Sequence, residues 1–340
     1  MQTKIHPDLI GLQEITEADR ILRSCVHCGF CTAVCPTYQM LGDELDGPRG
    51  RIYLIKDMLE ENRVSRDATR HIDRCLTCRA CEAACPSGVE YGWLLDIGRA
   101  FIAERQKPRL TWRVMAAGLR AVVPRPALFT SLLRLGQSVR ALLPPSLKNT
   151  VPQRQKVRAY PVSTTSAPAG QVVILQGCVQ RATTPNVNRA FEYLLSLNNI
   201  GFQYAPGEGC CGAVDLHLSA HDAAVDRMKA LIDRLWPYID NVDAIVSTAS
   251  GCGLTIKEYP RVIGDDPVYA ERAARIAEKV VDASEFLADV TFECEPAVVA
   301  FQSPCSLQHG RRLDGKVESI LRRAGMTLTE VPEPYMCCGS

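Results

Sequence analysis

Eight of the chain's 16 cysteines form two runs with one pattern, C-x2-C-x2-C-x3-C-P. The first run extends from Cys25 to Pro36 and the second from Cys75 to Pro86. Three thiolates at this spacing wrap one face of a cubane, and the proline after the fourth cysteine turns the chain away. Each run therefore predicts a [4Fe–4S] cluster, and the chain must fold around both.

The fourth cysteine of each run is expected to serve the cluster of the other run, as is usual in two-cluster arrangements. One predicted cluster is bound by Cys25, Cys28, Cys31 and Cys85. The other is bound by Cys75, Cys78, Cys81 and Cys35. Structural zinc is the alternative, but zinc ribbons use paired C-x2-C knuckles without a third cysteine followed by C-P. His27 is interpreted as a solvent-side neighbour and not as a ligand.

The segments around the two runs have helical periodicity. Apolar residues recur at helical spacing over Arg49–Glu61, and a second helix is predicted over Trp93–Glu104. Helices separated by two cluster motifs are typical of an α-helical ferredoxin, which we predict for residues 1–104. So small a module is expected to have little core of its own and to be held together by its clusters.

Residues 105–170 are predicted to form a basic helical connector that ends in a linker at Ser163–Gly170. From Arg105 to Arg158 the chain has 12 Lys or Arg and no Asp or Glu. Helical spacing over Trp112–Val123 and Leu128–Leu143 has two interpretations: core-packed helices with solvated arginines, or a basic amphipathic surface for an anionic membrane or acidic partner. The arginines expected on such a surface are Arg113, Arg120, Arg134 and Arg140.

The remainder of the chain contains an internal repeat. Cys178 is separated by 31 residues from Cys210-Cys211-Gly212, and Cys305 is separated by 31 from Cys337-Cys338-Gly339. Equal spacing of a vicinal cysteine pair indicates duplication. Residues 171–295 are predicted to form a first Cys-Cys-Gly (CCG) domain and residues 296–340 a second. The counterpart of Cys252 would lie near position 379, so the second copy is expected to be truncated.

In the first copy, short β-branched segments alternate with helical ones. Strands are predicted at Val172–Leu175, Phe202–Ala205 and Ala244–Thr248, and helices at Asn186–Leu197 and Ala220–Tyr238. This order predicts a parallel sheet. The fold class expected for the chain is therefore α+β and multidomain, with an α-helical ferredoxin followed by duplicated α/β CCG domains.

Four cysteines of the first copy lie just past predicted strands: Cys178, Cys210, Cys211 and Cys252. Sites in open α/β sheets form at the carboxyl ends of strands, so these thiols are expected to converge on one pocket. Three interpretations stay open: a further iron–sulfur cluster, a redox-active or substrate-handling thiol set, or unligated structural cysteines. The incomplete second copy offers Cys305, Cys337 and Cys338.

Three other residues near these motifs carry weaker signals. His217 and His309 are interpreted as packing residues or as neighbours of a ligand. Cys294 has no counterpart in the other copy and is interpreted as inert.

Charge, composition and hydropathy argue against several other classes of protein. The formal net charge is +1, so no overall field predicts nucleic-acid binding. Residues 1–12 include Lys4, His6 and Asp8 and no apolar segment, so no signal peptide is expected. The sequence contains no run of about 18 apolar residues, so no membrane-spanning helix is predicted. A long chain with this many cysteines then indicates a reducing compartment and thiolates used as metal ligands or in redox chemistry.

The motifs together resemble those of iron–sulfur subunits of membrane-associated respiratory dehydrogenases. That group includes heterodisulfide-reductase-like, anaerobic glycerol-3-phosphate dehydrogenase and lactate-utilisation subunits. Within it, the segments around the motifs most resemble the glycolate oxidase (glycolate dehydrogenase) iron–sulfur subunits. The segments that carry this resemblance are Cys25–Cys31, Gly42–Ile52, Asp73–Cys78, Cys210–Asp215, Thr248–Gly253 and Cys337–Ser340.

The resemblance implies an electron-transfer subunit with no catalytic residues of its own. FAD-binding subunits of the glycolate oxidase complex are expected to oxidise glycolate to glyoxylate, and this chain to pass the electrons towards a membrane quinone. The resemblance also implies a peripheral position on the cytoplasmic side of the inner membrane. The sequence has no G-x-G-x-x-G after a strand, so it predicts no dinucleotide site here.

Other functions stay open at this point. The chain resembles iron–sulfur subunits of lactate or glycerol-3-phosphate dehydrogenases as well. A heterodisulfide-reductase-like enzyme would handle thiols at the CCG pocket without a flavin partner. An iron–sulfur sensor or scaffold would have no electron donor, and the absence of a nucleic-acid-binding motif argues against it.

Overall fold

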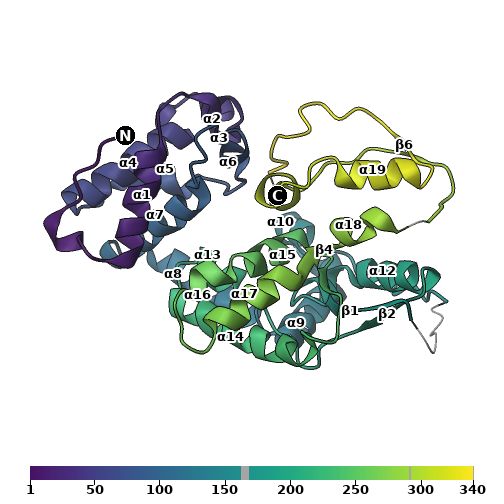
Figure 1. The fold of residues 1–340 in the computed structure, drawn as a ribbon. Coiled ribbons are helices and arrows are strands. Elements are labelled where there is room, and N and C mark those ends of the chain that lie inside the picture. Colours follow the sequence, from purple (N-terminus) through teal and green to yellow (C-terminus); the bar gives the residue numbers. More distant parts are fainter. Residues whose placement is uncertain (162–167, 291, 340) are drawn as a thin grey trace. The chain divides into compact units, whose positions relative to one another are not determined.

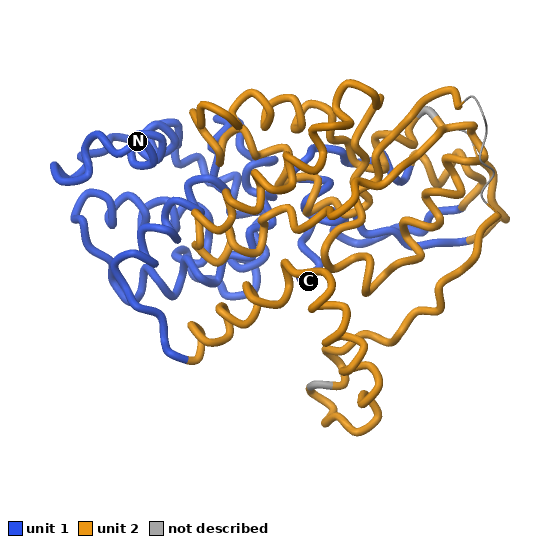
Figure 2. The backbone as a smooth tube through the Cα atoms, turned by 90° about the horizontal axis from the view of Figure 1, so that it is seen from below, with its two compact units in different colours: residues 1–110, 298–318, 327–340 blue, residues 111–297, 319–326 orange. Residues whose placement is uncertain are grey.

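The computed structural model of the protein describes residues 1–161, 168–290 and 292–339 (Figure 1). Contacts divide the chain into two compact units, which Figure 2 colours separately. Unit 1 comprises residues 1–110, 298–318 and 327–340, and unit 2 comprises residues 111–297 and 319–326. Most of the predicted linker, residues 163–167, lies outside the described residues. No helix in the described part of the chain is both long and apolar enough to cross a membrane.

The N-terminal part of unit 1 is helical, as predicted. Its helices are α1 (Gln13–Ser24), α2 (Phe30–Ala33), α3 (Pro36–Leu41), α4 (Pro48–Glu61), α5 (Arg66–Asp73), α6 (Ala80–Ala83) and α7 (Tyr91–Arg105), with the 3-10 turns η1 (Pro7–Leu9) and η2 (Glu44–Asp46). Helices α1, α4, α5 and α7 pack against one another (Figure 1). They share a core of 20 buried residues, so the module has more core than the sequence led us to expect. Much of the difference comes from α1, which the periodicity analysis missed and which buries Ile15, Ile21 and Leu22.

Helix α4 confirms the helix predicted at Arg49–Glu61. It begins with Pro48, whose missing N–H costs no helical hydrogen bond there, and it ends at Asn62 in a left-handed conformation. A Cβ atom on Gly50 would lie 2.1 Å from the carbonyl oxygen of Glu44. Glycine is therefore required for α4 to pack closely against η2.

The connector forms α8 (Leu110–Val122), α9 (Pro126–Ser138) and α10 (Pro145–Thr150), with the 3-10 turn η3 (Arg140–Leu142). Neither α8 nor α9 has a buried residue. Trp112, Val114 and Leu135 are exposed on these helices. The interpretation of two core-packed helices is therefore wrong for α8 and α9, which present apolar side chains to their surroundings.

Two of the four connector arginines contact protein groups. Nε of Arg120 lies 2.8 Å from Oδ1 of the buried Asp215. Nε of Arg140 donates to the Val151 carbonyl oxygen at 2.9 Å. Arg113 and Arg134 are exposed, so they are the two of the set that remain candidates for an external surface.

Unit 2 is centred on a four-stranded parallel sheet in the order β2-β1-β3-β4. The strands are β1 (Gly170–Leu175), β2 (Ile200–Gln203), β3 (Ala244–Ser247) and β4 (Val280–Asp282). The helices are α11 (Gln180–Thr183), α12 (Pro185–Leu197), α13 (Ala213–His217), α14 (His221–Leu235), α15 (Ser250–Lys257), α16 (Tyr259–Ile263), α17 (Ala270–Lys279) and α18 (Ala283–Phe286), with 3-10 turns η4 (Trp236–Tyr238) and η5 (Leu287–Asp289). The parallel sheet is confirmed, but β4 was not predicted because it is three residues long and follows α17 without a turn.

Both faces of this sheet are covered. Val172, Ile174 and Val246 pack with Phe191 of α12, and Phe286 of α18 joins the same cluster. Ile245 points to the other face, since successive strand residues alternate, and it is fully buried where α15 and α17 contact β3. Covered faces leave the carboxyl ends of the strands as the place for a site.

The second copy has a shorter version of the same pairing. Strand β5 (Val298–Val299) pairs in parallel with β6 (Thr327–Leu328). The π-helical turn η6 (Ser306–Gly310) and helix α19 (Lys316–Arg323) lie between them in the chain. Because β5 and β6 stand about one repeat length after β1 and β2, the backbone shows the duplication that the cysteine spacing predicts.

Candidate metal centres

The two N-terminal cysteine runs form the same loop. The third residue of each run has positive φ, 57° at His27 and 55° at Thr77. So does the fifth, 85° at Gly29 and 60° at Arg79. Left-handed residues within a turn direct successive N–H groups into a concavity that favours an anion, as at many iron–sulfur sites. Arg79 adopts this conformation without being glycine, which indicates that the surrounding loop holds it there.

The first hollow between these loops is lined by Cys25, Cys28, Cys31 and Cys85, and it has about 440 Å³ of empty volume. Cys25 is buried and Cys28 is exposed. The backbone N–H of Val89 donates to Sγ of Cys85 at 3.4 Å. The structure therefore brings the last cysteine of the second run to the first three of the first run.

The second hollow is lined by Cys35, Cys75, Cys78 and Cys81, and it has about 300 Å³ of empty volume. Cys81 also lines the first hollow. The two cysteine sets are those predicted for crossed ligation, which itself stays a prediction.

The donor set fits iron–sulfur clusters better than single zinc ions. Tetrahedral zinc with Zn–S distances of about 2.3 Å places its sulfurs about 3.8 Å apart. Over the described part of the chain, no three cysteine sulfurs lie within 4.8 Å of one another. Burial, with Cys25 next to it, raises the pKa of Cys31 to about 11, and burial raises the pKa of Cys78 to about 11. Such thiols become thiolates only with a cation among them, which a cluster supplies when bound.

His27 occupies the position expected of a neighbour, although it is partly buried. Its ring stacks on Tyr53 with centroids 4.6 Å apart, and its Nδ1 lies 4.0 Å from Sγ of Cys25. Burial, followed by nearby positive charge, lowers the pKa of His27. A neutral imidazole beside the first hollow follows from this environment.

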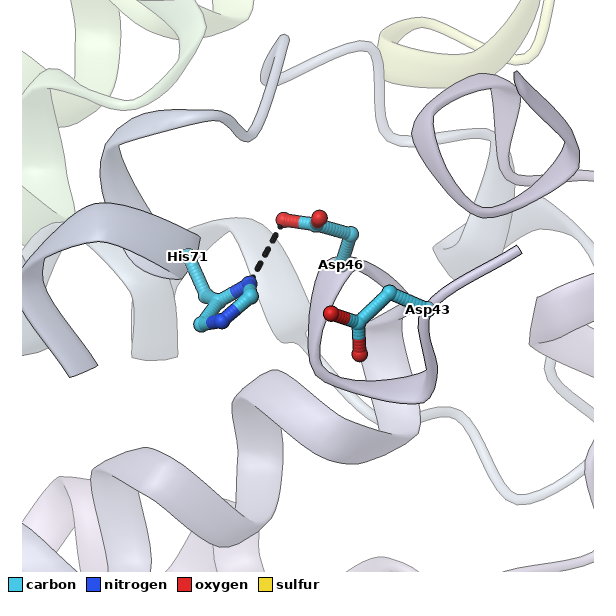
Figure 3. A group of neighbouring side chains, drawn as sticks. All are labelled: Asp43, Asp46 and His71. Carbon is cyan, nitrogen blue, oxygen red and sulfur yellow. Dashed lines mark hydrogen bonds and ion pairs between the residues drawn. The ribbon is translucent and has the colours of Figure 1, made fainter. Parts of the chain in front are cut away.

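Asp43, Asp46 and His71 form a group of acidic and imidazole side chains (Figure 3). Oδ1 of Asp46 accepts from His71 at 2.9 Å, and Oδ2 accepts from Arg74 at 2.8 Å. Burial alone would raise the pKa of Asp46, but these two hydrogen bonds lower it overall. With both carboxylate oxygens occupied, the group joins η2 to α5 and is not a cation site.

The four cysteines of the first CCG copy converge at the carboxyl ends of β1, β2 and β3, as predicted. Cys210 hydrogen-bonds with Cys178 and Cys211, and Cys211 hydrogen-bonds with Cys252. Cys252 lies in the first turn of α15, just past β3. Hydrogen bonds from its neighbours lower the pKa of Cys210, and the same contacts raise that of Cys211. The four thiols thus share protons that a metal would replace.

The loops that carry these thiols are held by hydrogen bonds from two charged side chains, the buried Glu208 and the half-buried Arg181. The Glu208 carboxylate accepts from the backbone N–H groups of Gln176 and Gly177, both at 2.9 Å. Arg181 donates to the carbonyl oxygens of Gly177 and Glu208, both at 3.0 Å. Tyr259 donates its hydroxyl to the Cys211 carbonyl oxygen at 2.8 Å. The sequence analysis missed these residues, because only the fold brings them to the cysteines.

The second copy places Cys305 beside Cys337. Burial, with Cys337 nearby, raises the pKa of Cys305 to about 12. Cys338 is exposed. His309 is buried with Nε2 2.8 Å from the Tyr335 carbonyl oxygen, and Cys294 donates to the Ala324 carbonyl oxygen at 3.0 Å. The first contact agrees with the packing role expected for His309, the inertness expected of Cys294 stays a prediction, and His217 lies in α13.

Comparison with known proteins confirms the resemblance drawn from the motifs. Residues 21–89 match a family described as a 4Fe-4S dicluster domain, and residues 172–257 and 299–340 match one described as a cysteine-rich domain. The dicluster match confirms that the N-terminal module carries two [4Fe–4S] clusters.

The full-length similarity is to glycolate oxidase subunits. The chain is 46% identical over 100% of its length to the glycolate oxidase iron-sulfur subunit of Escherichia coli (strain K12), of which it covers 84%. It is 31% identical over 94% of its length to a probable glycolate oxidase iron-sulfur subunit of Bacillus subtilis (strain 168), of which it covers 79%. Lactate utilization protein A of Bacillus thuringiensis (strain Al Hakam) is 25% identical over 50% of the chain, which covers 72% of that protein. No solved structure shows significant similarity to the chain.

Proposed function

The chain belongs to the family of glycolate oxidase iron–sulfur subunits, and we propose that it relays electrons from a flavoprotein partner that oxidises glycolate to glyoxylate. The observation that carries this proposal is the pair of hollows in unit 1, the first lined by five cysteines and the second by four, with both runs represented in each. Cys81 lines both hollows, so two clusters held there are close neighbours. Neighbouring one-electron centres are what a relay requires.

The electron balance fits this division of labour. Oxidation of glycolate to glyoxylate releases two electrons and two protons, and a flavin on the partner takes them up. Each [4Fe–4S] cluster carries one electron at a time, so the flavin passes its two electrons in sequence. A membrane quinone then accepts two electrons and two protons. In this scheme the chain's own residues hold the clusters, exclude water from them and bind no organic substrate.

The place where the electron donor docks is proposed to be the rim of the first hollow. Cys28 is the exposed cysteine of that set. Val26 and Phe30, on either side of it, are 66% and 62% exposed. Apolar side chains around an exposed ligand offer a partner both contact area and a short path to the cluster.

The four thiols of the first CCG copy are proposed to hold a further cluster. Cys178, Cys210 and Cys211 are buried, so a thiol substrate would have little access to them. Their shared hydrogen bonds raise the pKa values of Cys178 and Cys211 and lower those of Cys210 and Cys252. A cationic centre bound among the four sulfurs would favour the thiolate form of all of them. Heterodisulfide chemistry at this pocket is the alternative, and it is tested by the same experiment as the relay.

A peripheral position on the cytoplasmic side of the inner membrane is proposed for the complex. The support is the connector, where α8 and α9 expose apolar side chains among arginines. Such a surface suits an anionic bilayer, which attracts each nearby Lys or Arg by about 1 kcal/mol.

The deciding experiment is anaerobic reduction of the assembled complex by substrate. Glycolate, L-lactate and glycerol 3-phosphate are added separately, and EPR records cluster reduction. We expect reduced-cluster signals with glycolate, and none with this chain alone. Reduction by another of the three substrates would reassign the complex. Reduction of a disulfide by the isolated chain, with no flavoprotein present, would overturn the relay in favour of thiol chemistry.

A further inference from the structure

One cation in unit 1 is completely buried beside the second hollow. Arg51 of α4 is 1% exposed and lines that hollow together with the four cysteines. Its Nε donates to the His71 carbonyl oxygen at 2.7 Å, and its Nη1 donates to Oγ1 of Thr37 at 3.1 Å. These two contacts fix the plane of the guanidinium group.

The third guanidinium nitrogen of Arg51, unlike the other two, donates no hydrogen bond among the described residues. Nη2 is buried and has no hydrogen-bond partner among the described residues. The nearest carboxylate oxygen, Oδ1 of Asp46, is 3.6 Å away and already accepts from His71. A buried N–H group without an acceptor is costly, so this position implies an acceptor that fills the hollow. The sulfurs of a cluster and its thiolates are such acceptors.

A second buried donor points to the same centre. Tyr91, at the start of α7, is 4% exposed and also lines the second hollow. Its hydroxyl donates to Sγ of Cys75 at 3.6 Å. The second centre therefore has one buried guanidinium group in its wall and one buried hydroxyl that donates to a sulfur. The carboxylate nearest to Arg51, that of Asp46, is shared with His71 and Arg74.

The first hollow has a weaker version of this environment. Arg49, two residues before Arg51, lines the first hollow, but its side chain is 36% exposed and pairs with Glu44 at 2.6 Å. Water and the carboxylate screen its charge. His27, Ser87 and Tyr91 also line it, but the hydroxyl of Tyr91 donates to Sγ of Cys75, which belongs to the second set.

From this contrast we propose that Arg51 and Tyr91 set the reduction potential of the second cluster, holding it high enough that the electron rests there when the module is half reduced. Reduction adds one electron and no proton to a cluster, so the cluster gains one negative charge. A buried cation and hydrogen bonds to sulfur stabilise that added charge and raise the potential. Both are positioning residues, and the electron comes from the partner's flavin. The inference rests on the cluster ligation and relay proposed above.

The test is an EPR-monitored redox titration of the anaerobic holoprotein in four variants. Tyr91→Phe removes only the hydroxyl, Arg51→Met removes the charge, Arg51→Lys retains it, and Arg49→Met is the control from the first hollow. A Cys28→Ser variant assigns the two signals, because it alters the first cluster only.

We expect Tyr91→Phe to shift the one-electron equilibrium of the second cluster on the order of tenfold towards the oxidised form. A tenfold shift lowers the reduction potential by 59 mV for one electron. Arg51→Met should lower the potential of the second cluster further than Tyr91→Phe does. Arg51→Lys should keep that potential close to the wild-type value, and Arg49→Met should leave the potentials of both clusters near those of the wild type. If Arg51→Met loses its clusters, Tyr91→Phe decides alone. Two assigned clusters whose potentials do not respond to Tyr91→Phe would overturn this inference, whereas a wild type without cluster signals would overturn the relay itself.

Discussion

Arg120 donates from Nε to Oδ1 of Asp215 at 2.8 Å, and this ion pair joins the basic connector to the CCG domain. Asp215 lies in the first turn of α13, directly after the Cys-Cys-Gly triplet, and is 1% exposed. Arg227 of α14 binds its other carboxylate oxygen. The connector is therefore anchored beside the cysteine pocket by one arginine, which is not available to an external surface.

Removal of Asp215 should destabilise this contact. In Asp215→Ala, Arg120 and Arg227 lose a shared buried acceptor, at a cost of about 1–3 kcal/mol in the free energy of unfolding. Arg120→Met should cost about 1 kcal/mol or less, because its side chain is 39% exposed. Hydrogen exchange of the α8 amides in the holoprotein measures the local effect. Arg113→Met, an exposed arginine of the same helix, is the control, and an equal loss of protection there would contradict the prediction.

The sequence predicted features that depend on local spacing. The two cysteine runs predicted which cysteines line each hollow, while ligation by them stays a prediction. The interval of 31 residues between Cys178 and Cys210 located the repeat. The helix at Arg49–Glu61 and the strand at Val172–Leu175 followed from periodicity and β-branching. Each cysteine run, helix and strand among these lies within one segment of chain, so its spacing is visible there, and the repeat is visible because a second segment has the same spacing.

Features that depend on long-range contacts could not be predicted in this way. Arg51 of α4 lines the same hollow as Cys75, and Tyr91 of α7 donates to the Cys75 sulfur, because α4, α5 and α7 pack together. The partner of Asp215, Arg120, lies 95 residues away in the chain, so no local pattern could indicate their contact. The exposed apolar faces of α8 and α9 were also misjudged in one interpretation, since helical periodicity does not reveal what covers a face.

Crossed ligation predicts that single substitutions act across the two runs. Cys35→Ser should impair the cluster held by Cys75, Cys78 and Cys81 and leave the other largely intact. Cys85→Ser is the matched variant and should impair the cluster held by Cys25, Cys28 and Cys31. Iron and sulfide analysis with EPR of the reduced protein measures both. If each variant instead damages the cluster of its own run, ligation is local and the pairing is wrong.

The CCG quartet should contribute iron beyond the eight atoms that two cubanes hold. Cys211→Ala and Cys252→Ala should each remove this additional iron and lower electron transfer in the assembled complex, while both N-terminal EPR signals persist. Cys294→Ala is the control, because Cys294 donates to a backbone carbonyl outside the quartet. Iron content and activity equal to those of the wild type in Cys211→Ala would assign the quartet a packing role.

Membrane binding through the connector should depend on the exposed Arg113 and Arg134 and not on Arg120, which is paired with Asp215. Each Lys or Arg near an anionic bilayer contributes about 1 kcal/mol, so Arg113→Gln and Arg134→Gln should each weaken binding to phosphatidylserine-containing vesicles roughly fivefold. Arg120→Gln removes the same charge from α8, but Asp215 already holds that side chain, so its effect should be small.

Salt separates the electrostatic part of this binding from the apolar part. Screening acts over about 8–10 Å at ordinary ionic strength, so higher salt should weaken the wild type more than the double variant Arg113→Gln/Arg134→Gln. Trp112 and Leu135, 45% and 62% exposed, should retain part of the affinity if these helices insert at the interface. Vesicle flotation at two salt concentrations measures all of these effects. Equal losses in Arg113→Gln and Arg120→Gln, or binding that salt does not change, would show that the connector arginines do not face the bilayer.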